Sequence, residues 1–207
     1  KFLSKILNRG IIEALSIQCP EQLNGIEFIE VAPYLIKNNS LAQIAEETFV
    51  ESIIWRNPKA FSVNNKNTIK IINQYIIKTE SGYNQLLNAF LSVAPIPNHP
   101  FNAQFLHQYL SKFSMPKRDS CWSTFLHYQY GKQGAVDRLL YWSWSDQDKS
   151  HISDESIFLT SIALSWVLTT PNRFVRDKAT KGLVCLLENR IHLIPKLLEK
   201  FKDVNDP

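Results

Sequence analysis

The last forty or so residues show the pattern of paired helices, and this pattern most constrains what the chain can fold into. Pro171 ends one helical stretch and Asn172 can cap the next, because its side chain can accept hydrogen bonds from the free amides of a first helical turn. Apolar side chains then recur at three- and four-residue spacing: Val175, Ala179, Leu183 and Leu186. The spacing predicts a helix over residues 172–189, as in stacked helical repeats.

The preceding stretch, residues 154–169, predicts a helix that is buried on several sides, with Ser153 or Asp154 as its cap. Its apolar side chains surround most of the helix circumference: Ile157, Phe158, Ile162, Ala163, Leu164, Trp166, Val167 and Leu168. On the following helix, Val184 and Leu187 lie away from the main apolar stripe and predict a second neighbour. A helix that is covered on two sides is expected inside a stack.

Composition favours an all-helical chain with a sizeable core. Hydrophobic residues make up 44% of the 207 residues and aromatic residues 12%, which excludes a disordered segment. Only six glycines are present, and the prolines fall between periodic stretches. Sheets with many tight turns need more glycines, and prolines between periodic stretches are typical of breaks between helices. We therefore expect little or no strand.

Further helices are predicted along the chain by apolar periodicity, capping residues and helix breakers. They cover residues 40–55, with Ser40 as the cap, and then 68–78, 83–94, 102–113, 116–130 and 133–145. Asn64, Asn65 and Asn67 predict a loop before residue 68, and Ser81-Gly82 predicts a separator before residue 83. The pattern of residues 25–36 is compatible with either a helix or a strand.

Helix pairs recur about every 35 to 45 residues, the range of helical solenoids. The fold class expected is therefore all-α, an α-solenoid of antiparallel helix pairs in a HEAT- or TPR-like superhelix. Residues 95–100 contain three prolines and predict a connection between an N-terminal helical part, 1–94, and a HEAT-like part, 101–207. The chain opens at Lys1 without a methionine and stops at Pro207 without a closing element, so we expect both parts to be truncated pieces of a longer protein.

No motif of known catalytic chemistry is present in the sequence. It has no Gly-x-x-x-x-Gly-Lys-Ser/Thr, no Gly-x-Ser-x-Gly and no His-Glu-x-x-His, and its five histidines are scattered. The three cysteines are too widely spaced for a disulfide framework or a zinc site, which favours a reducing cytoplasm. The longest apolar run, residues 157–168, is too short to cross a bilayer. We therefore expect no catalytic, cofactor-binding or metal-binding residues, no enzymatic activity and no membrane partner.

Two groups of residues are candidates for a structural or interface role. The first is a cluster of large aromatic rings over residues 122–144, which predicts a local core or a binding surface. The second is on the helix from residue 172, where Arg173 and Asp177 stand at the spacing of an ion pair and Val175, Arg176, Ala179 and Leu183 resemble the second helix of a HEAT repeat. The candidate residues are Arg173, Arg176, Asp177, Trp122, Trp142 and Trp144.

Basic residues are concentrated near the end of the chain, whose formal net charge is +4. From Arg173 to Lys202, the acids Asp177, Glu188 and Glu199 face a larger set of bases: Arg173, Arg176, Lys178, Lys181, Arg190, Lys196, Lys200 and Lys202. With the aromatic cluster, this asymmetry leaves a nucleic-acid-binding helical-repeat module as the alternative function. A nucleic-acid partner is less favoured than a protein partner because no module signature accompanies these residues.

Several strings of the second half are distinctive when read together. They are Phe101-Asn102-Ala103 with Phe105-Leu106, Ser123-Thr124-Phe125-Leu126, Gly134-Ala135-Val136-Asp137-Arg138-Leu139, Ile152-Ser153-Asp154-Glu155, and Leu168-Thr169-Thr170 followed by Asn172-Arg173-Phe174-Val175-Arg176-Asp177-Lys178-Ala179-Thr180. This text resembles the helical region of large bacterial STAND-class NTPases, NACHT-like ATP-binding proteins that include the AVAST antiphage defence proteins. The resemblance covers the second half well and the first half loosely.

In that family, an N-terminal effector and a central NTPase precede a long helical-repeat region that senses a phage protein and triggers oligomerisation. The resemblance implies a non-catalytic scaffold or sensor fragment of a larger bacterial STAND-type ATPase in antiviral defence, located in the cytoplasm. Its protein partners would be other domains of the parent or a phage protein. Because the motifs quoted have no catalytic role in the family, the resemblance assigns no catalytic residue and no cofactor to this chain.

Overall fold

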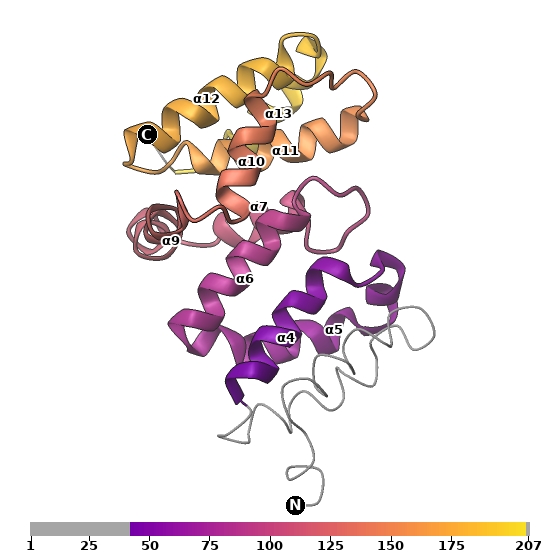
Figure 1. Ribbon diagram of the computed structural model, residues 1–207, viewed down its shortest axis with the longest axis vertical. Coiled ribbons are helices and arrows are strands. Elements are labelled where there is room, and N and C mark those ends of the chain that lie inside the picture. The colour runs from indigo at the N-terminus through magenta and orange to yellow at the C-terminus, as the bar shows by residue number, and fades with distance from the viewer. Residues whose placement is uncertain (1–41, 206–207) are drawn as a thin grey trace, which may run out of the picture. The chain divides into compact units, whose positions relative to one another are not determined.

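The computed structural model describes residues 42–205, with only the backbone at residues 60–65. Every regular element in this part of the chain is a helix, and residues 42–205 contain no strand (Figure 1). The prediction of an all-α chain is confirmed for this range. The predictions for residues 1–41, including the segment 25–36 and the Ser40 cap, lie outside it.

The chain divides into two compact units, Lys1–Ala89 and Phe90–Pro207. The division lies within helix α6 (Glu80–Val93), a few residues before the proline-rich stretch. Residues 95–100 are turns without helix, as the three prolines predict. Their role as a connection between an N-terminal part, 1–94, and a second part, 101–207, stays a prediction.

In the first unit, α4 (Ala42–Trp55) and α5 (Pro58–Gln74) are held together by a buried arginine. The Arg56 guanidinium donates to Ser52 Oγ of α4 at 2.5 Å and to Thr68 Oγ1 of α5 at 3.5 Å. Burial of this cation disfavours its charged form and lowers the pKa of Arg56 to about 10. Phe49 and Ile53 of α4 and Ile76 of the short 3₁₀ helix η1 (Ile76–Lys78) are fully buried.

The predicted loop at Asn64, Asn65 and Asn67 is wrong, because α5 runs through all three positions. The helix starts early: the Asn57 side chain accepts from the amide of Lys59 at 2.9 Å, and Pro58 occupies the first turn, where its missing N–H costs nothing. An asparagine inside a helix costs about 0.7 kcal/mol relative to alanine. That cost is small beside the burial of the apolar side chains that follow on the same helix.

The predicted separator at Ser81-Gly82 is also part of a helix, since α6 begins at Glu80. Thr79 Oγ1 accepts from the amide of Gly82 at 3.1 Å and thereby caps the first turn. A Cβ at position 82 would lie 2.6 Å from the carbonyl oxygen of Ile76, so glycine permits the close approach of the preceding turn. Gly82 therefore allows the first turn of α6 to pack closely against the preceding turn, and it does not interrupt a helix.

The second unit contains the helices predicted over residues 102–189, within a few residues of their expected ends, and after residue 189 it contains two helical elements that were not predicted. Its helical elements are α7 (Ala103–Leu110), α8 (Met115–Arg118), the π-helical turn η2 (Asp119–Ser123), α9 (Thr124–Gln129), α10 (Ala135–Trp144), α11 (Asp154–Val167), α12 (Arg173–Leu187), the 3₁₀ turn η3 (Ile191–Leu193) and α13 (Ile194–Phe201). Asn102, Ser153 and Asn172 cap α7, α11 and α12 through their side chains. Gly131 follows α9 with φ of 87°, a conformation that favours glycine.

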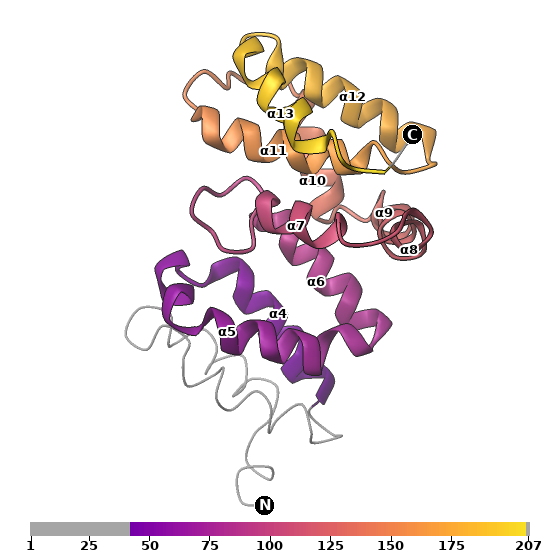
Figure 2. The ribbon, with the colours of Figure 1, turned by 180° about the vertical axis from the view of Figure 1, so that it is seen from behind.

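Helix α11 is the central helix of the second unit. It contacts α7, α10, α12 and α13, and Figures 1 and 2 show it beside α12 from both directions. Three of its hydroxyl groups are satisfied within the helix: Thr160, Ser161 and Ser165 each donate to the carbonyl four residues earlier. The predicted burial of this helix on several sides is therefore confirmed.

Helix α12 packs against both α10 and α11, and its contact with α10 is close because of Gly182. A Cβ at this position would come within 2.9 Å of the Cβ of Ser143 on α10, closer than real side chains approach. Leu187 is buried, as expected of a residue facing a second neighbour. Val184 is 59% exposed, so its predicted second neighbour is absent among the described residues and that prediction is wrong.

A buried histidine makes the stability of this unit depend on pH. His107 of α7 lies against the rings of Trp166 (5.6 Å) and Phe201 (4.9 Å). Burial, together with the nearby positive charge of Lys200, lowers the pKa of His107 from 6.5 to about 4. The unfolded chain therefore takes up this proton at a higher pH than the folded chain. The stability contributed by the neutral ring is complete above pH 6.5 and is lost as the pH falls towards 4.

We expect the wild-type protein to lose about 2 kcal/mol more stability than His107→Gln between neutral pH and pH 5. The measurement is urea denaturation at a series of pH values, followed by circular dichroism. His127→Gln is the matched control because His127 is exposed. Equal pH dependence in wild type and His107→Gln would show that His107 titrates normally in the folded protein.

Candidate functional site

Trp122 is a core residue of the second unit. Its side chain is fully buried, its ring stacks on Phe125 at 5.6 Å, and its indole N–H donates to the carbonyl oxygen of Trp166 on α11 at 2.8 Å. This hydrogen bond joins residues that are far apart in the sequence. Trp122 is thus inaccessible to a partner and acts structurally.

Trp142 and Trp144 stand on α10 in different surroundings. The half-buried ring of Trp142 lies under the ammonium group of Lys149 at 5.7 Å, and Lys149 also donates to the carbonyl oxygens of Ser145 (2.6 Å) and Gln147 (3.2 Å). These contacts fix the connection between α10 and α11. Trp144 is exposed and lies under Lys181 of α12 at 5.6 Å.

Arg173 and Asp177 form the ion pair that their spacing predicts, with Arg173 Nε 3.5 Å from Asp177 Oδ2. Both side chains are exposed, so water screens the attraction and the pair contributes little to stability. The pair belongs to the outer face of α12. Arg176, one turn along, points its guanidinium back to the carbonyl oxygen of Thr170 at 3.4 Å.

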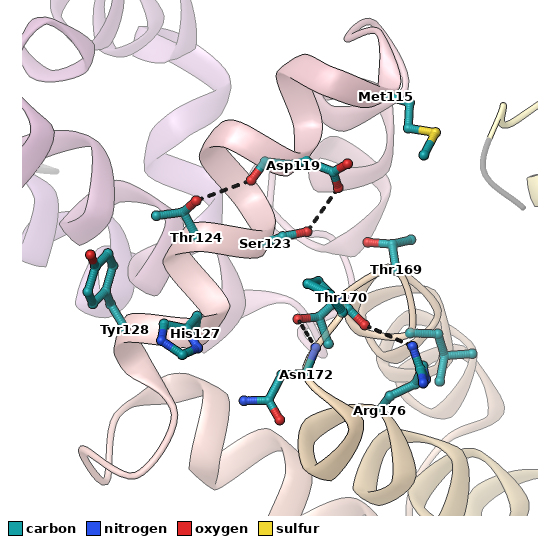
Figure 3. Close-up of a pocket in the computed structure, with 12 residues that line it drawn as sticks. Met115, Asp119, Ser123, Thr124, His127, Tyr128, Thr169, Thr170, Asn172 and Arg176 are labelled. Carbon is teal, nitrogen blue, oxygen red and sulfur yellow. Dashed lines mark hydrogen bonds between the residues drawn. The ribbon is translucent and has the colours of Figure 1, made fainter.

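Arg176 lines a pocket of about 1060 Å³ between the helical residues 115–129 and the connection from α11 to α12 (Figure 3). One wall carries a π-helical turn, in which Asp119 Oδ1 accepts from Ser123 Oγ at 3.2 Å and the Asp119 carbonyl accepts from Thr124 Oγ1 at 3.2 Å. Such turns widen a helix locally and are frequent at functional sites. The opposite wall carries Asn172, whose side chain caps the start of α12, and Thr170, whose hydroxyl accepts from the amide of Asn172.

The polar side chains that line this pocket include a serine, Ser123, and a histidine, His127. The hydroxyl of Ser123 donates to a carboxylate of its own helix, and His127 lies exposed with its ring 5.6 Å from that of Tyr128. A serine is activated when a histidine accepts its proton, which this hydrogen bond does not provide. A carboxylate, an imidazole, hydroxyl groups and an aromatic ring thus line this pocket.

A smaller hollow of about 320 Å³ lies on the outer face of α10 and α12. We call it the aromatic groove, and its lining residues are Tyr130, Gln133, Asp137, Arg138, Leu140, Tyr141, Trp144 and Lys178. Lys178 stands over the ring of Tyr130 at 5.2 Å, next to Lys181 over Trp144. Exposed aromatic rings beside cations are typical of binding surfaces.

A third hollow, of about 630 Å³, is built around a bracing ion-pair network. Asp154, at the start of α11, accepts from Arg190 Nε at 3.1 Å and contacts His192 Nε2 at 2.7 Å. The hydrogen bond from His192 is the main cause that lowers the pKa of Asp154. Arg190 also donates to the carbonyls of Lys149 and Ile152, so these groups hold the connection between α10 and α11 against the end of α12.

The six candidate residues do not form one site in the structure. Arg176 lines the 1060 Å³ pocket, Trp144 lines the aromatic groove, and Arg173 with Asp177 stands exposed on α12. Trp122 and Trp142 are structural. Sequence reasoning missed Tyr141, Lys178 and Lys181 as individual surface residues. The spacing of Lys178 and Lys181, one turn apart on a helix, is the signal that could have indicated their common face.

Among residues 42–205, no group of three or more histidine, cysteine, aspartate or glutamate side chains is placed to hold a metal ion. None of the helices in this same range is long and apolar enough to span a bilayer. Comparisons with protein-family models, with curated proteins and with solved structures found no match to this chain.

Proposed function

We propose that this chain is a non-catalytic helical-repeat segment that binds protein, a scaffold or sensor within a larger bacterial STAND-type ATPase of antiviral defence. In this proposal the helices form an α-solenoid of antiparallel pairs of the HEAT or TPR type. The observation that carries it is the position of α11, which α7, α10, α12 and α13 surround. A helix that is buried by neighbours on several sides is what an interior position of a stacked array requires.

The surface of the second unit supports binding as the activity. Large apolar side chains stand exposed on α12, among them Phe174 and Val184, and the aromatic groove lies beside this helix, between α10 and Lys178 of α12. Aromatic side chains that stay exposed are enriched where proteins meet other proteins. The similarity of residues 168–180 to the helical region of the STAND-class proteins supports the proposed parent and its cytoplasmic, antiviral setting.

The test uses the intact parent gene in a bacterial host that is challenged with a panel of phages. Deleting residues 101–207 should abolish protection and capture of the phage target, while ATP hydrolysis by the remaining protein shows that its NTPase still folds. A variant of the parent's own ATP-binding lysine should lose protection but still capture the target. Unchanged protection and unchanged capture after the deletion would refute the proposal.

The second candidate function is a nucleic-acid-binding helical-repeat module. Lysines that stand over tyrosine and tryptophan rings at 5.2 and 5.6 Å are the observation that favours it, because stacked bases and phosphates use the same two groups. It predicts that affinity for a labelled single-stranded oligonucleotide falls steeply as salt rises. No binding at low salt would exclude this candidate.

A further inference from the structure

The walls of the aromatic groove come from two helices that pack closely. Tyr141 and Trp144 stand one turn apart on α10, and Lys178 and Lys181 stand one turn apart on α12. Each lysine reaches a ring, Lys178 that of Tyr130 and Lys181 that of Trp144. Gly182 lets α10 and α12 approach, so the rings and the ammonium groups share one surface with a fixed geometry.

The rings of this surface are open to solvent although the unit has a well-filled core. Tyr141 is 68% exposed and Trp144 38%, while Trp122 in the π-helical turn η2 is fully buried. Phe174, one turn before Lys178 on α12, is 74% exposed. The hollow between the rings is about 320 Å³, at the lower end of the volumes of ligand pockets.

The charges around the groove indicate that a partner bound there is negatively charged. Within residues 42–205, no carboxylate forms an ion pair with Lys178 or Lys181. The lining carboxylate, Asp137, accepts from the backbone amides of Gly131 (3.0 Å) and Gln133 (2.8 Å), so it is committed to the loop before α10. The two ammonium groups can therefore receive carboxylates from outside, and binding would remove water from both the ion pairs and the rings.

We infer that the aromatic groove docks a linear segment of a partner protein in which an aromatic or large apolar side chain is flanked by Asp or Glu. The apolar side chain enters the hollow between Tyr141 and Trp144, and the carboxylates meet Lys178 and Lys181. This inference rests on the proposed protein-binding function and names the surface and the chemistry of its partner.

Fixed negative charge on the same helices favours a peptide over a nucleic acid as the occupant. A nucleic-acid strand has a phosphate at every nucleotide and is matched by a continuous line of cations. Here Asp137 lines the groove beside Arg138, and Asp177, which pairs with Arg173, precedes Lys178 on α12. A peptide can place its few carboxylates opposite the lysines alone, whereas a phosphate backbone would bring charge to both aspartates.

The experiment uses the full chain as bait for a phage-displayed library of random twelve-residue peptides. The most enriched peptide is then synthesised with a fluorescent label, and its Kd is measured by fluorescence anisotropy. We expect the enriched sequences to combine an aromatic residue with Asp or Glu. The double variant Lys178→Ala/Lys181→Ala should bind at least tenfold more weakly, as should Tyr141→Ala, with thermal unfolding little changed because Lys181 and Tyr141 are exposed and Lys178 is only half-buried.

Lys112→Ala/Lys117→Ala is the matched control, since both lysines are exposed and the variant loses the same charge. It should keep the wild-type Kd. The inference is overturned if no peptide is enriched, if the enriched peptides are basic, or if both double variants weaken binding equally. It is also overturned if a labelled fifteen-nucleotide oligo-dT binds more tightly than the peptide and loses affinity in Lys178→Ala/Lys181→Ala. Loss of the groove interaction with phage-target capture intact in the parent would refute this surface and leave the proposed function standing.

Discussion

Replacing Trp122 with alanine is expected to destabilise the second unit by about 3 to 5 kcal/mol. The side chain is fully buried and stacks on Phe125, so its removal leaves a cavity in the core. The carbonyl oxygen of Trp166 would also lose the indole N–H that donates to it at 2.8 Å. The measurement is the free energy of unfolding in urea, from circular dichroism.

Two further variants separate the causes of this effect. Trp122→Phe keeps most of the ring volume but removes the hydrogen bond, so we expect an intermediate loss of stability. Trp144→Ala is the matched control: it removes the same type of side chain from a surface position of the same unit and should cost clearly less. If Trp144→Ala and Trp122→Ala cost the same, the assignment of Trp122 to the core is wrong.

Replacing Gly182 with leucine is expected to cost about 3 kcal/mol, although leucine is a much better helix former than glycine. The reason is steric, because even a Cβ at position 182 would lie 2.9 Å from the Cβ of Ser143. A larger side chain must push α12 away from α10 or force both side chains out of their rotamers. Urea denaturation measures the loss, and an increase in exposed apolar surface can be followed by binding of a hydrophobic dye.

Thr180→Leu is the control for Gly182→Leu, since Thr180 lies exposed on the same helix and should tolerate the change within about 0.5 kcal/mol. A double-mutant cycle with Gly182→Ala and Ser143→Gly tests the contact itself. Removing the Ser143 side chain should recover part of the stability that Gly182→Ala loses, because the two positions touch. Additive effects of the two changes would contradict the proposed close approach.

The helix ends of the second unit could be predicted well, because local chemistry determines them. Asn102, Ser153 and Asn172 accept hydrogen bonds from the first amides of their helices, and Gly131, just after α9, has a conformation that few other residues adopt. The first unit was predicted less well. Asn64 and Asn67 lie inside α5, where the cap at Asn57 and the packing of the helix outweigh their weak preference for turns.

For the candidate site, the sequence predicted which residues to consider but not which of them are buried and which are exposed. Spacing along a helix predicts the ion pair of Arg173 with Asp177, and the structure contains it. Spacing cannot tell Trp122 from Trp144, because both belong to the same aromatic-rich stretch and their difference lies in the neighbours that cover them. Trp122 contacts α11 through Trp166, which lies 44 residues later in the sequence. Trp144 contacts a lysine of α12 and solvent.

The sequence by itself determined that the described part of this protein is helical, where most helices of the second unit begin and end, and that α11 is buried on several sides. These properties follow from caps, breakers and apolar periodicity, which act within a few residues. Only the tertiary structure decided which tryptophan is core, that Val184 is exposed, and that Lys178 and Lys181 stand over aromatic rings. The physical reason is that burial depends on segments distant in the sequence, and the contact of α12 with α10 at Gly182 and Ser143 brings such segments together.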